Sequence, residues 1–400
     1  MGGARNKRAA NSIRAAACLL LTLAAGPLAA SHSPAVYERL DSAVRSYAAL
    51  ARNGGWQPIA DGLDLQLGQR DGQVPAIRER LRITGDYTGP GEANPYLFEA
   101  ALDVAVRRFQ QRHGLPVNGI VSPLVREAMN VPVEKRLAQL TAARATHASL
   151  PPVLGERYVW INLPAARLDA IEDGESALSM RTVVGKPQRP TPELQSEIRH
   201  LVLNPHWTIP PRIARLDVLP KQARDPDYLG SRDIRVFAGW QTDAPELSPS
   251  ELPWQEYLRG RNFPYRLRQD PGPQNSLGQV KIAFANPYDV YLHDTPSRVL
   301  FDLPIRTFSS GCVRLEDALA LSRWLLANNA ERDRARVAGQ RARGRRTLFL
   351  EEPVPLYMVY LTAWLDDAGE VHFRPDIYDR IPPAVLTQED ALEIQLSVLP

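Results

Sequence analysis

Apolar residues recur at helical spacing through the first third of the chain. One helical face runs through residues 34–52, and a double glycine soon after it predicts where that helix ends. A second helix is predicted over residues 73–81. The strongest signal follows in residues 102–115, with apolar side chains at i, i+3, i+4 and i+7: Leu102, Ala105, Val106 and Phe109. We therefore predict a helical region over residues 31–145, in which Phe109 belongs to the core.

The second part of the chain changes to short apolar runs that are typical of β-strands. Two such runs, at residues 158–163 and 166–172, precede Asp173-Gly174, a pair that favours a tight hairpin turn. Further strands are predicted at residues 200–203, 281–284, 290–293, 348–350 and 357–366. One helical pattern, at residues 316–329, interrupts them. The sequence therefore predicts a multidomain α+β protein, with a helical region first and a β-rich region after it.

Residues 207–277 lie inside the β-rich region but show only weak periodicity. They are rich in proline, arginine, aspartate and aromatic residues. A plain loop of this length is uncommon in a compact domain. We predict a partly structured insert that caps the β-rich region, with Trp207 either anchoring the segment or touching a ligand.

The first thirty residues have the order of a secretory signal. Basic residues without any acid come first, followed by the apolar run 15–23 and by small residues that end at Ala30. The basic side chains are Arg5, Lys7, Arg8 and Arg14. We predict a signal peptide over residues 1–30, cleaved after Ala30, that exports the chain. The alternative is a retained N-terminal anchor, although the apolar run is short for a bilayer.

Removal of that segment changes both the charge and the cysteine count. Four positive charges leave with it, so the formal net charge falls from +3 to −1, and nothing favours nucleic-acid binding. Of the two cysteines only Cys312 remains, in a compartment where thiols are oxidised or paired. A single thiol there is either buried and inert or present for its chemistry. Three histidines lack zinc-ligand spacing, so we predict no metal and no cofactor: His200, His206 and His372.

The neighbours of Cys312 suit nucleophilic chemistry. His293 ends a predicted strand nineteen residues earlier, and Gly311 directly precedes the cysteine. A thiol needs a nearby base, or a site that stabilises the thiolate, before it is an effective nucleophile. Gly311 would let a substrate carbonyl approach the backbone, whose N–H groups could hold an oxyanion. Taken alone these residues leave two interpretations open, a catalytic pair or a buried apolar cysteine.

The sequence around Cys312 resembles a known family. HDTP at residues 293–296 is followed by SSGCVR at residues 309–314, and this order resembles the signature of YkuD-type L,D-transpeptidases. Further blocks resemble the large Gram-negative, periplasmic members in the same order: residues 184–192, 203–211, 271–284 and 360–374. Residues 97–131, with AVRRFQQRHGLPVNG, resemble a three-helix peptidoglycan-binding domain. The resemblance covers the chain from about residue 35 to residue 385.

The resemblance implies a division of the chain after the signal peptide. It comprises a helical scaffold at 31–96, a peptidoglycan-binding-like helical domain at 97–150, an L,D-transpeptidase catalytic domain at 151–385 with its insert at 207–277, and a tail at 386–400. The family's catalytic domain is β-sandwich-like and holds the thiolate at its cleft. The protein would therefore act on the cell wall from the periplasm.

The family's chemistry implies a cysteine acyl-enzyme. The thiol attacks the amide between meso-diaminopimelate and D-alanine of a tetrapeptide stem, D-alanine leaves, and the amine of a second stem resolves the thioester as a 3→3 cross-link. The implied partners are the stem peptides and glycan of peptidoglycan and other cell-wall synthases, with no nucleic acid, and with a membrane only if the signal segment is retained. Water as acceptor would make the protein an L,D-carboxypeptidase, and a lipoprotein acceptor would attach that protein to the wall. The alternative from another class is a catalytically silent wall-binding protein.

The resemblance also assigns roles by position to the residues of the motif. Cys312 would be the nucleophile and His293 the general base and acid. Gly311 and the Cys312 amide would contribute to the oxyanion site. Three groups could orient His293: the Asp294 side chain, a backbone carbonyl or Ser309.

The remaining site residues are expected to contact substrate. Tyr291 lies two residues before His293 on a predicted strand, so both side chains should share a face and Tyr291 should line the pocket. Arg314 would either pair with a substrate carboxylate or brace the loop. Further contacts are expected from Ser309, Ser310 and Trp207.

Overall fold

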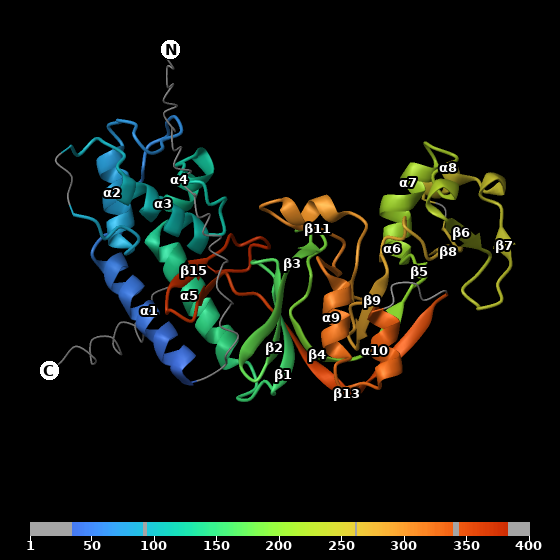
Figure 1. The fold of residues 1–400 in the computed structure, drawn as a ribbon. Coiled ribbons are helices and arrows are strands. Elements are labelled where there is room, and N and C mark those ends of the chain that lie inside the picture. The colour runs from blue at the N-terminus through green and yellow to red at the C-terminus, as the bar shows by residue number, and fades with distance from the viewer. Residues whose placement is uncertain (1–33, 91–93, 261, 339–343, 383–400) are drawn as a thin grey trace, which may run out of the picture.

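The computed structural model describes residues 34–90, 94–260, 262–338 and 344–382. The predicted signal peptide (residues 1–30) and tail (residues 386–400) lie outside the described residues. Within that part of the chain, no helix combines the length and the apolar character that a membrane crossing requires. A helical region and a small insert lie on opposite sides of a β-rich region (Figure 1). The predicted multidomain α+β class is confirmed.

The first region is helical, as its apolar spacing predicts. Its helices are α1 (Pro34–Arg52), α2 (Val74–Ile83), α3 (Ala100–Arg112), α4 (Pro123–Met129) and α5 (Val133–Ala148). Two glycines with positive φ shape the chain between them. Gly114, at φ 66°, follows the end of α3, and Gly119, at φ 75°, makes the turn before α4. The apolar spacing thus predicted α1, α2 and α3 individually, and α4 and α5 as part of a helical region.

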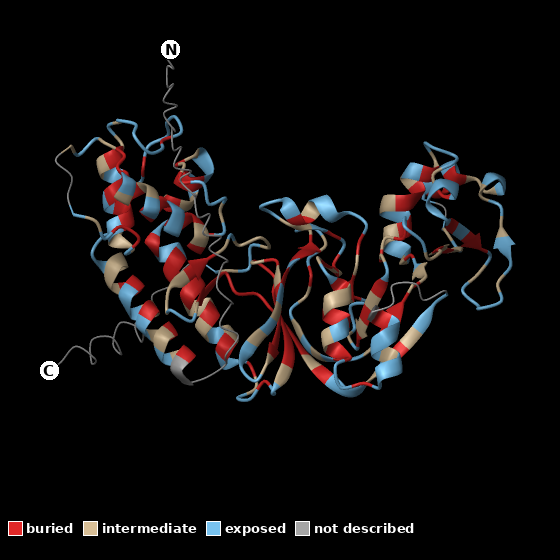
Figure 2. Ribbon diagram, viewed as in Figure 1, coloured by how far each residue is buried: buried red, intermediate tan, exposed pale blue. Residues whose placement is uncertain are grey.

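These helices form two separate cores. Helices α2, α3 and α4 share one core, in which Phe109 is fully buried as predicted. Helices α1 and α5 pack against each other and against the β-rich region, in a core that includes Trp160, Tyr357 and Phe373. Figure 2 shows the buried positions of the helical region gathered on its inward faces. Helix α2 therefore packs with α3, although a boundary at residue 97 would separate them.

A buried ion pair ties α3 to the turn after α2. Arg112 donates from Nε and Nη2 to the two carboxylate oxygens of Asp86, at 2.8 and 2.6 Å. Arg112 is 5% exposed and Asp86 is 4% exposed. Arg112 also donates to the carbonyl of Val371, at 2.5 Å, so the same side chain joins the helices to the C-terminal strands.

Asp86→Asn is therefore expected to destabilise the protein by about 3–5 kcal/mol, because it leaves a buried guanidinium without its counter-charge. Urea unfolding measures this difference. The matched control is Glu79→Gln, which removes an exposed partner of Arg82 and should cost less than about 1 kcal/mol. Equal losses in the two variants would show that Asp86 and Arg112 do not act as a buried pair.

The β-rich region forms a sheet that closes on itself. The strand order is β11-β3-β12-β10-β9-β4-β13-β1-β2, and β2 pairs again with β3. The bounds are β1 (Arg157–Asn162), β2 (Arg167–Glu172), β3 (Glu175–Gly185), β4 (Leu194–Leu203), β9 (Val280–Phe284), β10 (Leu292–His293), β11 (Thr307–Ser309), β12 (Val313–Leu315) and β13 (Arg346–Val359). Asp173 and Gly174 both take positive φ in the turn between β2 and β3, as the sequence pair predicts.

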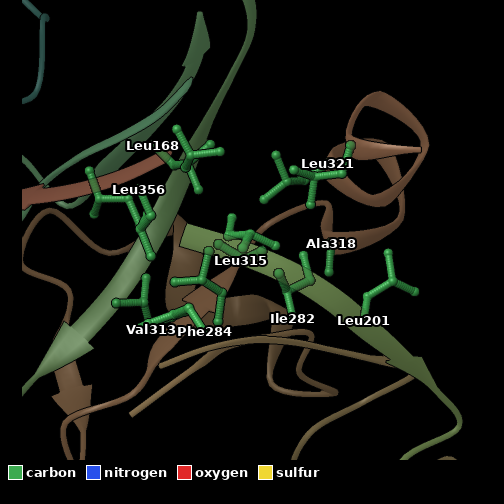
Figure 3. Packing of buried hydrophobic residues seen from close by; sticks show 14 of the residues in the cluster. Leu168, Leu201, Ile282, Phe284, Val313, Leu315, Ala318, Leu321 and Leu356 are labelled. Carbon is green, nitrogen blue, oxygen red and sulfur yellow. The ribbon is translucent and has the colours of Figure 1, made fainter. Parts of the chain in front are cut away.

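The interior of this closed sheet is apolar. Figure 3 shows Leu168, Ile282, Val313, Leu315 and Leu356 together in this core, and strands β2, β9, β12 and β13 contribute them. The helix α9 (Ala318–Leu325) packs against the same core. Because β9 and β12 are anchored by their buried faces, the ends of these strands have fixed positions.

Two sequence predictions differ from the structure in this region. The predicted strand 357–366 is divided: β13 ends at Val359, and β14 (Ala363–Leu365) pairs with β15 (Val371–Phe373) under the helices. The predicted helix 316–329 is shorter, because the Asp317 side chain caps α9 by accepting from the Ala320 N–H at 2.8 Å. A second helix, α10 (Glu331–Ala338), follows it.

The segment 207–277 has a sheet and a core of its own. Its strands are β5 (Trp207–Thr208), β6 (Ile234–Phe237), β7 (Glu246–Leu247) and β8 (Arg266–Gln269), and its short helices are α6 (Pro211–Ile213), α7 (Leu219–Gln222) and α8 (Trp254–Leu258), with a π-helical turn η1 (Ala214–Val218) between α6 and α7. Buried residues of these elements form a separate apolar cluster, against which Trp207 packs. The insert is thus an ordered unit beside the β-rich region (Figure 1).

Candidate functional site

Two neighbouring parallel strands bring Cys312 and His293 together. Strands β10 and β12 pair with Leu292 opposite Val313 and His293 opposite Arg314. The Val313 N–H donates to the Tyr291 carbonyl at 3.1 Å, which places Cys312, one residue earlier, at the start of β12. Residues nineteen apart in the chain therefore become spatial neighbours through the sheet.

The turn before Cys312 is held in place by a buried serine. Ser309 Oγ accepts from the Gly311 N–H at 3.1 Å and donates to the Cys312 carbonyl at 2.5 Å. Ser309 is 2% exposed. Its hydroxyl is therefore occupied inside the turn and braces it, which differs from the substrate contact expected from the sequence.

The glycine of the motif is required by backbone geometry. Gly311 has φ 120°, a conformation that L side chains rarely adopt, while a Cβ there would meet nothing closer than 3.6 Å. The N–H of Gly311 is already bonded to Ser309. Among the described residues no acceptor is recorded for the N–H of Cys312. The free donor beside the thiol is thus the Cys312 amide, whereas Gly311, which was expected to contribute to the oxyanion site, has its N–H bonded to Ser309 and shapes the turn.

The imidazole of His293 is buried, neutral and oriented. Its Nδ1–H donates to the carbonyl of Asp294 at 2.5 Å, which leaves Nε2 as an acceptor. Burial, together with the positive charge of Arg314, lowers the pKa of His293 to about 3. The sequence left three groups open as the one that orients His293, and in the structure it is a backbone carbonyl, that of Asp294. The Asp294 carboxylate instead accepts from the Gln279 N–H at 2.9 Å.

The thiol of Cys312 lies half-buried beside polar groups that favour its ionised form. Burial raises the pKa of Cys312, and the backbone of Tyr291, the charge of Lys281 and the hydroxyl of Tyr291 each oppose that rise. Arg314 acts in the same direction more weakly. The resting pair is therefore a neutral thiol beside a neutral imidazole, with positive charge placed to stabilise a thiolate when the proton leaves.

Tyr291 connects the thiol to the insert. The Trp207 indole lowers the pKa of the Tyr291 hydroxyl and the Cys312 thiol raises it, so both side chains lie close to this hydroxyl. Burial raises the pKa of Tyr291, so its hydroxyl keeps its proton. The ring lies edge-on to His293 with centroids 5.8 Å apart. Trp207 therefore both packs in the insert and holds a side chain of the site.

Lys281 is a site residue that the sequence reasoning missed. It lies on β9 directly opposite His293 on β10, so their side chains share one face of the sheet. Its ammonium lies 4.0 Å from the centroid of the Tyr291 ring. Burial lowers the pKa of Lys281, and the nearby Cys312 thiolate raises it. The available signal was a lysine at a position of β9 that alternates with core residues, on the face away from the core, but its meaning depends on the strand pairing.

Arg314 lies near the thiol and has no carboxylate partner in the described part of the chain. Its pKa is lowered by burial and raised by the charge of Cys312. Its Nε is buried and has no hydrogen-bond acceptor among the described residues. Of the two roles expected for Arg314, this arrangement favours a contact with a substrate carboxylate.

Ser310 connects the nucleophile turn to the insert through an arginine. Ser310 is exposed and its Oγ accepts from Arg189 at 2.8 Å. Arg189 also forms an ion pair with Asp217 of η1. Neither Arg189 nor Asp217 was expected from the sequence, because the three residues lie far apart in the chain. The insert is thus tied to the site at Trp207 and at Asp217.

The chain matches two family models. Residues 156–341 match the model of the L,D-transpeptidase catalytic domain (YkuD). Residues 70–129 match a model described as "Putative peptidoglycan binding domain". The second match starts before α2 and ends with α4, so it spans the helices that share one core.

One curated relative and several solved structures are similar to the chain. A "Putative L,D-transpeptidase" of Haemophilus influenzae is 30% identical over 252 residues, which are 62% of this chain and 50% of the relative. The chain thus spans about half the length of the curated relative it matches. An L,D-transpeptidase of Stackebrandtia nassauensis aligns over 76% of this chain and 97% of its own, at 13% identity and a TM-score of 0.27. One from Mycobacterium smegmatis covers 51% and 58% of the two chains, at 14% identity and a TM-score of 0.25.

The TM-scores of these structures are low, so the similarity of the chain to the family is carried by the sequence matches. The matched catalytic range contains Lys281, Tyr291, His293 and Cys312. It also contains the whole insert. Residues 156–341 are thus similar to the L,D-transpeptidase catalytic domain family, and residues 70–129 before them are similar to a peptidoglycan-binding domain family.

Proposed function

We propose that the protein is a peptidoglycan L,D-transpeptidase with Cys312 as its nucleophile. The observation that carries this proposal is the placement of Cys312 beside the neutral His293, whose unprotonated Nε2 is available. Both lie within the matched catalytic domain. A neutral imidazole can accept the thiol proton, which is the first requirement of the reaction.

The acylation step uses these two residues. The thiol attacks the carbonyl of the amide between meso-diaminopimelate and D-alanine, and His293 accepts the thiol proton. The Cys312 N–H donates to the oxyanion that forms. The carbon–nitrogen bond then breaks, His293 returns the proton to the departing amine of D-alanine, and a thioester remains on Cys312.

The second step transfers the acyl group. The side-chain amine of a second stem attacks the thioester, His293 accepts a proton from that amine, and the carbon–sulfur bond breaks. The sulfur leaves as a thiolate that is reprotonated, and a 3→3 cross-link is released. Lys281 and Arg314 stabilise the sulfur anion in both steps, and Tyr291 lines the pocket and donates to the sulfur.

Lys281→Met tests this charge assignment. Removing the ammonium should raise the pKa of the Cys312 thiol, so alkylation by iodoacetamide should slow by about tenfold at pH 8 and its midpoint should move to higher pH. Intact-protein mass spectrometry at several pH values measures both. The control is Lys135→Met, at an exposed position of α5. Identical midpoints in the two variants would refute the role of Lys281.

The rest of the chain supports the same setting. The two domain matches point to the cell wall or the periplasm, and we infer export by the signal peptide at residues 1–30. We propose that the catalytic domain extends over residues 151–385 and that the insert at 207–277 caps the site, with Trp207 and Asp217 as its contacts. The helices before it would bind the glycan and peptide of the wall.

The test of the function is a product analysis. Purified protein is incubated with a disaccharide-tetrapeptide, and the products are identified by mass spectrometry. Cross-linked dimer with free D-alanine is the expected result. Tripeptide alone would identify an L,D-carboxypeptidase, and unchanged substrate would refute the enzymatic proposal.

A further inference from the structure

A second pocket lies between the helical region and the β-rich region, apart from the site of Cys312. Its volume is about 390 Å³, within the usual range for small-ligand sites of roughly 300–1,000 Å³. Gln111 of α3 forms one wall, and residues of β2, β3, β14 and β15 form others. None of the site residues Lys281, Tyr291, His293, Cys312 and Arg314 lines it.

Four arginines and two carboxylates line this pocket, and the carboxylates are already used. The arginines are Arg167, Arg181, Arg306 and Arg374. Arg181 donates from Nε and Nη2 to Oε1 of Glu316, at 3.1 and 2.5 Å, and its backbone N–H donates to Oε2 at 2.9 Å. Asp366 accepts from His372 at 2.9 Å and from the Glu370 N–H at 2.8 Å.

Two of the arginines have no carboxylate partner among the described residues. Arg306 donates only to carbonyl oxygens, those of Ala165, Ala166, Thr182 and Leu303. Arg374 donates from Nη1 to the carbonyls of Arg112 and Phe373, at 2.9 and 2.7 Å. Carbonyl oxygens satisfy the N–H groups but leave the positive charge uncompensated.

The positive charges of the arginines in this pocket repel one another. Burial, and then the charges of Arg306 and Arg167, lower the pKa of Arg374 to about 9. Burial and the charge of Arg181 lower the pKa of Arg306. The guanidinium groups still keep their charge at neutral pH. The pocket therefore holds excess positive charge away from bulk water, which an anion would neutralise.

We propose that this pocket binds a carboxylate of the acidic stem peptide of peptidoglycan, as a second subsite that rests on the proposed function. Arginine forks match carboxylate geometry and can bind it through two parallel hydrogen bonds. Trp364 and Met180 supply apolar wall beside the charges, as a peptide ligand requires. The pocket joins α3 of the peptidoglycan-binding match to strands of the catalytic domain. A single peptidoglycan chain bound here would therefore contact both the helical region and the β-rich region.

Gln111→Glu is the variant that tests the proposal. It is isosteric, Gln111 makes no side-chain hydrogen bond within the described part of the chain, and the new carboxylate would line the pocket together with the arginines. The introduced carboxylate should pair with the arginines of the pocket, so that a carboxylate of the ligand can no longer bind to them. Gln66→Glu makes the same chemical change at an exposed position outside the pocket and is the matched control.

The probe is a fluorescein-labelled stem tripeptide ending in meso-diaminopimelate, which lacks the D-alanine leaving group. Fluorescence anisotropy with the full chain should show binding that is about tenfold weaker in Gln111→Glu than in wild type, or about 1.4 kcal/mol, and unchanged in Gln66→Glu. The tripeptide with its carboxyl groups amidated should bind weakly to all three. Equal binding by Gln111→Glu and Gln66→Glu, or undiminished binding of the amidated peptide, would overturn the proposal.

Product analysis on the same proteins separates this inference from the proposed function. If wild type forms cross-linked product while Gln111→Glu binds tripeptide normally, the subsite is wrong and the function stands. If Gln111→Glu alone loses tripeptide binding while no protein forms product, the function is wrong and the carboxylate site stands.

Discussion

Replacing Cys312 with alanine is expected to abolish release of D-alanine and formation of cross-linked product, a loss of at least about 10⁴-fold in kcat. The thiol is the group that forms the covalent intermediate, and no other free cysteine lies within the described residues. No described serine replaces it, because Ser309 is buried in its turn and Ser310 is bound by Arg189. Quantification of D-alanine and of the cross-linked dimer measures the loss.

The fold of the Cys312→Ala variant should be unaffected. The turn is held by Ser309 and Gly311 through backbone groups that the substitution leaves intact. Co-sedimentation with isolated wall sacculi and the thermal unfolding midpoint should therefore match wild type. An alanine variant that still releases D-alanine would rule out Cys312 as the nucleophile.

Replacing His293 with glutamine is expected to lower kcat/KM by about 10²–10⁴-fold, the usual contribution of a general base. Glutamine keeps a polar side chain of similar length at a buried position but cannot accept the thiol proton. Steady-state kinetics with the tetrapeptide substrate measures the effect. His200→Gln is the control, because His200 on β4 contacts Phe349 on β13 and lies outside the site; equal kinetics in the two variants would contradict the assignment.

The low pKa of His293 also determines how pH acts on the protein. Burial keeps the folded-state pKa near 3, below the unfolded value of about 6.5. The unfolded chain therefore binds the extra proton first, so stability from this residue is present above pH 6.5 and is lost as the pH falls toward 3. The acid limb of kcat/KM should lie well below pH 6.5, and His293→Gln should reduce the loss of stability between pH 6.5 and pH 4.

Much of the architecture could be predicted because it depends on local pattern. The spacing of Leu102, Val106 and Phe109 predicts α3 and its buried face, and Asp173-Gly174 predicts the hairpin after β2. The motif predicts Cys312, His293 and Gly311 together because the signature that it resembles contains all three at this spacing.

The remaining site residues depend on pairings that local pattern does not contain. Lys281 belongs to the site only because β9 pairs with β10 in the register that places it opposite His293. Arg189 contacts Ser310, which lies 121 residues later in the chain, and Asp217, which lies 28 residues later. The serine of the turn was expected to contact substrate because burial of Ser309 cannot be read from the motif.

The division of the helical region shows the same limit. The boundary at residue 97 was implied by the resemblance to a peptidoglycan-binding domain, but Ile77 and Leu81 of α2 share a core with Leu102 and Phe109 of α3. The hairpin β14–β15 is likewise a tertiary feature, because Phe373 packs between the helices and the β-rich region. A continuous apolar run at 357–366 predicts one strand, since it contains no signal for the break after Val359.

The account depends most directly on a covalent bond between Cys312 and the donor stem. Intact-protein mass spectrometry of wild type, quenched with acid during turnover of disaccharide-tetrapeptide, should detect an adduct with the mass of the donor minus D-alanine. Peptide mapping should place this adduct on Cys312, and hydroxylamine should remove it, as expected for a thioester. Product formation without any adduct, or an adduct on another residue, would contradict the account.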